Sequence, residues 1–124
     1  MRNDSIVLDT NIVVFLFKGD QRLALQLEEM RLVLSAVSRI ELYSWKVMEG
    51  EKLTLLDEFM ERCTIVEIDK EVQDAAIKLR RAKRITVTDA IVAATAMVKG
   101  IPLFTGDKDF KALGKEVRIV LYEP

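Results

Sequence analysis

The chain has 124 residues, 50% of them hydrophobic, which is enough apolar material for one folded domain and argues against a disordered protein. Basic and acidic residues nearly cancel to a formal net charge of -1, which argues against attachment to nucleic acid through bulk charge alone. The sequence has no histidine and a single cysteine, Cys63, which excludes Ser–His and Cys–His catalytic pairs, histidine-rich zinc sites and an intrachain disulfide.

The first half of the chain alternates short apolar runs with stretches of helical periodicity. In chain order we expect a strand at residues 5–8, a short buried helix at 11–17, a helix capped by Asp20, a strand at 31–34, a helix from Ser35 or Ser38 to about Met48, and a further amphipathic helix after Gly50.

The second half continues this alternation. We expect a strand at residues 64–68, a helix capped by Asp69, a helix from about Thr88 to Gly100, and strands at 102–105 and 117–122. Strands separated by helices indicate an α/β fold with a mainly parallel sheet. No repeat, linker or low-complexity tract divides the chain, so residues 1–124 are predicted to form one domain.

The sequence predicts a cytoplasmic protein. Its first five residues lead straight into the first predicted strand, which argues against a signal peptide. The longest apolar run, residues 12–17, is far shorter than the ~20 residues of a membrane span, so no membrane partner is expected. A lone cysteine fits a reducing compartment.

Four acidic residues stand where a parallel sheet places its ligand site, beyond the carboxyl ends of the strands. Asp9 directly follows the first predicted strand, and Asp107 follows the fourth by two residues. Glu41 lies early on the helix after the second strand. Asp89 is in the first turn of a later helix, and residues 83–87 must bring the chain back to this edge. We therefore expect these carboxylates to lie together.

Clustered carboxylates repel one another, and a divalent cation relieves that repulsion. Oxygen ligands suit Mg²⁺ or Mn²⁺. Such an ion activates water and stabilises a phosphoryl transition state, which replaces the general base that a chain without histidine lacks. The acids therefore favour metal-assisted hydrolysis of phosphodiester bonds.

Each acidic residue also has a structural alternative. Asp9 can cap the helix that follows it, and Asp89 lies where an acid complements a helix dipole. Asp107 and Asp109 can be ordinary turn residues, and Glu41 can be a solvated helix residue. Position alone leaves these readings open.

Four segments in order resemble proteins of the PIN-domain family over essentially the whole chain. They are Asp-Thr-Asn-Ile from residue 9, Ser-Arg-Ile-Glu-Leu from 38, Thr-Asp-Ala-Ile-Val-Ala-Ala-Thr-Ala from 88 and Pro-Leu-Phe-Thr-Gly-Asp-Lys-Asp-Phe from 102. The best match is the small toxin nuclease of VapBC-type toxin–antitoxin pairs. The resemblance implies a five-stranded parallel sheet in the order 3-2-1-4-5 flanked by helices, Mg²⁺- or Mn²⁺-dependent endoribonuclease activity, homodimerisation and inhibition by a cognate antitoxin.

The resemblance also assigns roles to residues. It implies that Asp9, Glu41 and Asp89 bind metal directly or through water. Asp107 is the favoured fourth acid, and Asp109 is its possible partner. Thr10, Asn11 and Thr105 are then supporting residues that hydrogen-bond a carboxylate or a bound water.

Other features bear on the RNA substrate and on protein partners. The basic cluster at residues 80–84 can guide phosphates towards the acids or can be a solvated helix end. The apolar residues 12–17 and the region from Tyr43 to Met60, with Trp45, pack in a core or contribute to a dimer or antitoxin contact.

Two related functions stay open, a housekeeping RNA-processing nuclease of the same family and a non-catalytic RNA-binding scaffold. A receiver-type phosphoacceptor domain also clusters acids at strand ends. It needs a lysine at the end of its last strand, whereas residues 117–122 are followed by Glu123 and Pro124.

Overall fold

The computed structural model describes residues 4–124, which form alternating strands and helices. The five strands are β1 (Ser5–Leu8), β2 (Arg31–Ser35), β3 (Thr64–Val66), β4 (Leu103–Thr105) and β5 (Ile119–Leu121). The helices are α1 (Thr10–Phe17), α2 (Gln21–Leu27), α3 (Ala36–Ser44), α4 (Glu51–Arg62), α5 (Lys70–Ala82), α6 (Val87–Lys99) and the 3₁₀ helix η1 (Lys108–Leu113).

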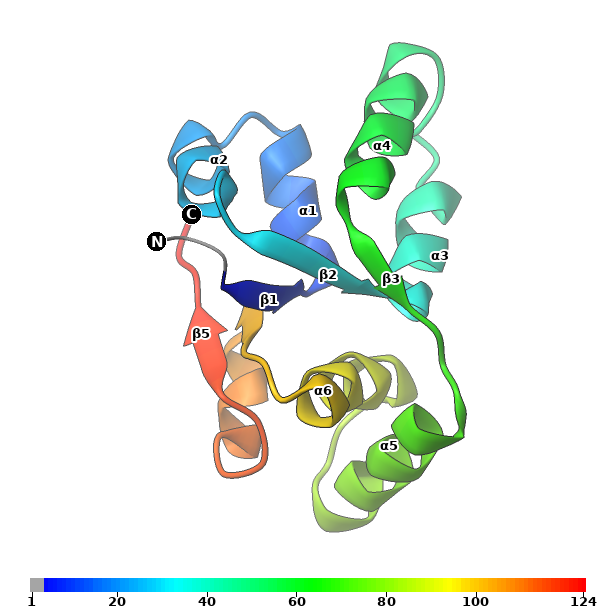
Figure 1. The fold of residues 1–124 in the computed structure, drawn as a ribbon, viewed down its shortest axis with the longest axis vertical. Coiled ribbons are helices and arrows are strands. Elements are labelled where there is room, and N and C mark those ends of the chain that lie inside the picture. The colour runs from blue at the N-terminus through cyan, green and yellow to red at the C-terminus, as the bar shows by residue number, and fades with distance from the viewer. Residues whose placement is uncertain (1–3) are drawn as a thin grey trace.

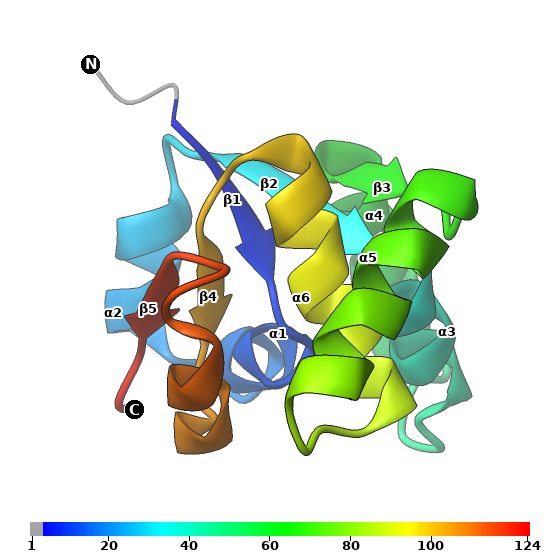
Figure 2. The same ribbon diagram turned by 90° about the horizontal axis from the view of Figure 1, so that it is seen from below.

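The strands form one sheet in the order β3-β2-β1-β4-β5, with every neighbouring pair parallel. Val7 is aligned with Val33 on one side and with Leu103 on the other. The predicted fold class and strand order are therefore confirmed. All strand carboxyl ends meet at one edge of the sheet, where α1 and α3 begin (Figures 1 and 2).

Helices cover both faces of the sheet, as a parallel sheet requires (Figure 1). Successive strand residues point to opposite faces. Val7 and Val33 pack with α5, α6 and η1, whereas Leu8 and Leu34 pack with α1, α2, α3 and α4. The two buried clusters fix the orientation of the strands and hence the position of the edge where they end.

Capping residues set the starts of the helices. Asp20 accepts a hydrogen bond from the Leu23 N–H and Asp69 accepts one from the Val72 N–H, so both predicted caps are confirmed. Ser35 caps α3, which settles the choice between Ser35 and Ser38. Gly100 ends α6 in the left-handed region, with φ of 67°, as expected for a C-terminal glycine.

Three predicted boundaries are wrong for identifiable reasons. The third helix ends at Ser44 rather than about Met48, because Trp45 turns to an extended backbone with ψ of 123°. The third strand stops at Val66 rather than residue 68, because its partner β2 ends at Ser35 and leaves no further pairing. The last strand is confined to Ile119–Leu121, the three residues that pair with β4.

The 3₁₀ helix η1 was not predicted, because its sequence reads as a turn. Among residues 4–124, no helix has the length and apolar character needed to cross a membrane.

Candidate active site

The carboxylate of Asp9 sits at the junction between β1 and α1, almost fully buried, with 7% of the residue exposed. Its Oδ1 accepts a hydrogen bond of 2.8 Å from the Thr10 N–H. Its Oδ2 accepts one of 2.8 Å from the Thr105 hydroxyl and one of 3.2 Å from the Asn11 amide. Asp9 is thus the N-cap of α1, which confirms the capping alternative. Its second carboxylate oxygen is fixed by side chains from α1 and β4.

Glu41 comes to the same edge from α3. Its Oε1 accepts a hydrogen bond of 2.6 Å from the Thr10 hydroxyl. Thr10 therefore links two predicted site residues, since its backbone N–H binds Asp9 and its side chain binds Glu41. The expected supporting role of Thr10 has this geometric basis.

The turn after β4 is fastened to the start of α1. The Asn11 Oδ1 accepts a hydrogen bond of 3.1 Å from the Gly106 N–H, while its amide nitrogen donates to Asp9. The Thr105 hydroxyl donates to Asp9 and accepts from the Asp107 N–H at 3.0 Å. Asn11 and Thr105 therefore fix the position of the Asp107 segment relative to Asp9.

Asp107 and Asp109 lie at the start of η1. The Oδ1 of Asp107 accepts a hydrogen bond of 2.9 Å from the Asp109 N–H and so caps this helix. Only one oxygen of the Asp107 carboxylate takes part in that cap, which leaves the other as a potential ligand. The capping alternative and a binding role are compatible at this position.

Asp89 reaches the site from the first turn of α6, so the chain does return to this edge between α5 and α6 (Figure 2). The helix begins earlier than expected, because Thr86 is its N-cap and accepts a hydrogen bond of 3.1 Å from the Asp89 N–H. Sequence reasoning missed Thr86. The signal was present, since Thr-x-x-Asp before an apolar run is the pattern of a capping box.

The environment of Asp9 disfavours its charged form. Burial raises the pKa of Asp9 from 3.8 to about 6, against the lowering effect of its hydrogen bonds with Thr105 and the Thr10 N–H. The negative charges of Asp89 and Asp107 raise the pKa further. Burial and two neighbouring carboxylates therefore both disfavour the negative charge of Asp9.

Asp89 is also repelled by neighbouring carboxylates. Burial raises the pKa of Asp89, and the carboxylates of Asp107, Glu41 and Asp109 add to that effect. Asp89 thus interacts electrostatically with Asp9, Glu41, Asp107 and Asp109, and Asp9 also interacts with Asp107. The five predicted acids therefore lie at one edge of the sheet, linked through Asp89.

The donor set suits a hard divalent cation, because carboxylates, a hydroxyl and an amide supply only oxygen ligands. Within residues 4–124, no three acidic or cysteine side chains form a group that could hold an ion directly as they stand. Mg²⁺ needs fewer protein ligands than that, since it usually keeps several waters and is held by one or two carboxylates. The residues present fit such an ion by charge and by ligand type.

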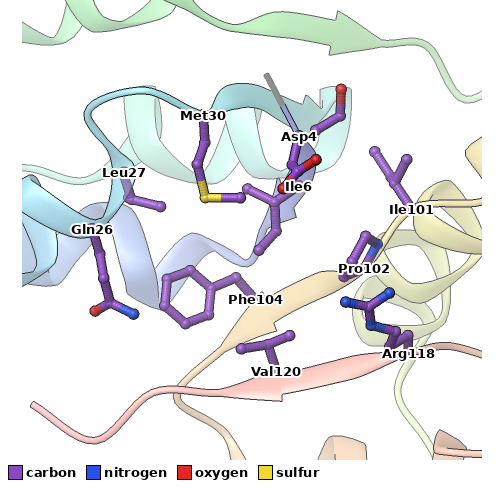
Figure 3. Close-up of a pocket in the computed structure, with 11 residues that line it drawn as sticks. Asp4, Ile6, Gln26, Leu27, Met30, Ile101, Pro102, Phe104, Arg118 and Val120 are labelled. Carbon is purple, nitrogen blue, oxygen red and sulfur yellow. The ribbon is translucent and has the colours of Figure 1, made fainter. Parts of the chain in front are cut away.

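A cavity of about 470 Å³ lies at the opposite edge of the sheet, beside the amino ends of β1 and β4 (Figure 3). Ile6, Met30 and Phe104 are among its apolar lining residues, and the charged side chains of Asp4 and Arg118 also line it. A single carboxylate there does not offer the oxygen ligands found at the carboxyl edge. The chemistry that the sequence predicts therefore belongs to the carboxyl edge.

Comparisons with known proteins support one family. A model of the PIN domain matches residues 6–116. A chain in the crystal structure of VapBC2 from Rickettsia felis bound to promoter DNA has 20% identity and a TM-score of 0.82, over 96% of this chain and 99% of that one. A chain in a toxin–antitoxin complex from Klebsiella pneumoniae has 24% identity and a TM-score of 0.82, over 96% of this chain and 99% of that one. A chain in the crystal structure of FitAcB from Neisseria gonorrhoeae has 25% identity and a TM-score of 0.74, over 92% of this chain and 95% of that one. The comparison with curated proteins gave no match.

Proposed function

The chain belongs to the PIN-domain family, and from this premise we propose that it is a metal-dependent endoribonuclease that acts as the toxin of a toxin–antitoxin pair. One observation carries the catalytic part of the proposal. Acids from four separate segments meet at the carboxyl edge of the sheet, where burial and mutual repulsion raise the pKa of Asp9 and Asp89.

We assign the binding of Mg²⁺ or Mn²⁺ to this cluster. Asp9 and Asp89 are its principal ligands, because their charges are the ones that the site destabilises and a cation restores. Glu41 and Asp107 act directly or through bound water, and Asp109 lies beside them as an auxiliary acid.

When bound, the ion supplies a water activated at neutral pH and neutralises charge that develops on the phosphate. The protein's own side chains orient the ligands. Thr105 and Asn11 hold Asp9 Oδ2, and Thr10 holds Glu41, so neither carboxylate has to reorganise when substrate arrives. Attack of water on phosphorus leaves a 5′ phosphate and a 3′ hydroxyl.

Basic side chains on the segment that leads into the site favour a nucleic acid as the substrate. The cluster at residues 80–84 occupies the end of α5 and the turn that leads to Thr86 and Asp89. Arg80 is tied to the Ile85 carbonyl at 3.1 Å, whereas Arg81 and Arg84 are exposed and make no ion pair with any residue from 4 to 124. These cations can attract the phosphate backbone towards the acids.

An apolar groove supports the proposed antitoxin partner. A cavity of about 480 Å³ lies between α1, α2 and α4, with Leu16, Phe17, Leu55 and Phe59 among its lining residues. The Phe17 and Phe59 rings meet edge to face, with centroids 6.1 Å apart, and Leu55 is 50% exposed. We propose that apolar side chains of the cognate antitoxin fill this groove, as the likeness to toxin–antitoxin complexes suggests.

We also propose that the protein forms a homodimer. Of the apolar run at residues 12–17, Ile12 and Val13 are fully buried in the core, so only its later part can contact a partner. Exposed apolar side chains on α3, α5 and α6, namely Ile40, Ile77 and Val87, offer further surface for a second copy.

The catalytic proposal is tested by RNA cleavage with Mg²⁺ or Mn²⁺, with and without excess chelator. Chelator should stop cleavage, and Asp89→Asn should abolish it while the protein stays folded. Asp74→Asn is the matched control, because Asp74 is a surface residue whose one ion pair within residues 4–124 is with Lys70, at 2.7 Å, and such pairs contribute little. Cleavage that persists in chelator would contradict the metal mechanism.

A further inference from the structure

A third cavity shares two residues with the acidic site. It measures about 520 Å³, within the range of about 300–1,000 Å³ that is typical of small-molecule sites. Its lining residues are Thr10, Val14, Glu41, Leu42, Ser44 and Trp45. Because Thr10 and Glu41 also belong to the acidic site, a group that occupies this cavity lies directly beside the carboxylates proposed to hold the metal.

The Trp45 backbone is fixed beside this cavity, and its indole packs against the core. Trp45 directly follows the end of α3, and its backbone N–H donates to the Leu42 carbonyl at 3.3 Å. Its carbonyl accepts a hydrogen bond of 3.0 Å from the Met48 N–H. The indole packs against the core around α1 to α4 and stays partly exposed. An aromatic surface held in this way loses little entropy on binding a ligand.

The neighbouring segment is fixed as well. The Tyr43 hydroxyl donates a hydrogen bond of 2.7 Å to Asp57 Oδ1, which ties α3 to α4 on both sides of the Trp45 turn. The turn therefore presents its aromatic side chain from a rigid support. Rigid aromatic surfaces next to a phosphate site are how proteins bind unpaired nucleotides.

We propose that this cavity binds one nucleobase of a single-stranded RNA substrate, stacked on the Trp45 indole, next to the phosphate that is cut. This inference rests on the proposed ribonuclease function and adds a specificity-determining residue to it. Ser44 and Thr10 are among the lining residues, so the Ser44 hydroxyl can donate to or accept from the polar edge of the base, and the Thr10 hydroxyl, which donates to Glu41, can accept from it.

The charge of the lining selects a base over other occupants. The Glu41 carboxylate disfavours a phosphate or an acidic side chain inside the cavity, whereas Val14, Leu42 and Trp45 favour a planar uncharged ring. A double helix cannot supply such a ring without unpairing, so the cavity favours single-stranded RNA.

Fluorescence provides a direct binding test, because Trp45 is the only tryptophan in the chain. Asp89→Asn protein is titrated with a single-stranded RNA hexamer in Mg²⁺, so that the RNA stays intact. Stacking should quench the fluorescence, and a hexamer with abasic positions should bind without quenching it. Equal quenching by both hexamers overturns the proposal. A change that depends on protein concentration and not on RNA assigns the cavity to a second copy and also overturns it.

Cleavage kinetics provide the second test. Trp45→Leu keeps an apolar side chain without a ring, and it should raise KM by roughly 5- to 150-fold, the equivalent of one lost base–aromatic stack, and flatten the base preference at one position. Trp45→Phe keeps an aromatic ring, so it should retain part of the affinity for substrate and part of the base preference. This result separates loss of stacking from loss of folding. Val47→Ala is the control, since Val47 is exposed in the same turn but does not line the cavity.

The nucleobase site and the ribonuclease activity can be tested independently of each other. If the unmodified protein cuts RNA in a metal-dependent way but Trp45→Leu leaves KM and base preference unchanged, the nucleobase site is wrong and the ribonuclease stands. If the unmodified protein does not cut RNA and the hexamer still quenches Trp45 selectively, the base site stands and the catalytic proposal is wrong.

Discussion

Asp9→Asn tests whether the buried Asp9 carboxylate is destabilising when no metal is bound. The pKa of Asp9 is raised from 3.8 to about 6, so the folded protein holds its proton more tightly than the unfolded chain. Between these two values the unfolded state loses its proton first, and stability falls as pH rises. At neutral pH the shift is equivalent to about 3 kcal/mol of lost stability, at 1.36 kcal/mol per pKa unit.

Asparagine removes the charge and disturbs the hydrogen bonds. Both Asp9 oxygens accept hydrogen bonds, so in either orientation the new amide nitrogen faces a donor, and the mismatch costs about 1–3 kcal/mol at any pH. At pH 4, where Asp9 is protonated in the folded state, the variant should be equally or less stable than the unmodified protein. By pH 7.5 its relative stability should rise by about 2–3 kcal/mol.

The assay is urea unfolding in chelator at pH 4 and pH 7.5, followed by circular dichroism. Asp69→Asn is the matched control, because Asp69 also caps a helix but lies outside the acidic cluster, and asparagine is about as good a cap. A stability difference between Asp9→Asn and the unmodified protein that is the same at both pH values would refute the claim that Asp9 carries a buried, repelled charge.

Three further predictions concern the supporting structure. Asn11→Ala removes the link between Asp9 and Gly106, so kcat should fall about 10- to 100-fold with little change in KM, and an unchanged kcat would show that the link is not needed. Gly106→Ala places a Cβ 3.0 Å from a Phe15 ring carbon, so thermal unfolding should show a loss of about 1–3 kcal/mol that Phe15→Leu partly restores, and full stability would contradict the close approach. Light scattering at micromolar concentration should give about twice the chain mass, and a strict monomer alone and with an antitoxin counts against the homodimer.

Much of the fold could be predicted because local signals agree with the packing. The strand at residues 5–8 is apolar on both faces, as a central parallel strand must be, and the caps Asp20 and Asp69 stand directly before amphipathic runs. The end of α3 could not be predicted in the same way. Neither glycine nor proline marks Ser44, and the helix stops because the chain turns at Trp45 towards α4.

The candidate site also has parts that the sequence predicts and parts that it does not. The positions of Asp9 and Asp107 follow from the rule that parallel strands end at one edge, so sequence and topology suffice for them. The bridge from Asn11 to Gly106 joins segments 95 residues apart, and no local pattern reports such a contact. The cavity beside Trp45 likewise depends on how α1 and α3 pack, which the sequence left undecided between core and partner surface.

The most direct test of metal-assisted hydrolysis is the chemistry of the cut ends. A labelled RNA is cleaved by the unmodified protein with Mg²⁺ or Mn²⁺, and the termini of its products are identified, with Asp89→Asn as the inactive reference. Attack by an activated water predicts 5′ phosphate and 3′ hydroxyl ends. Products with a 2′,3′-cyclic phosphate and a 5′ hydroxyl, or cleavage at the unmodified rate by Asp89→Asn, would contradict the account.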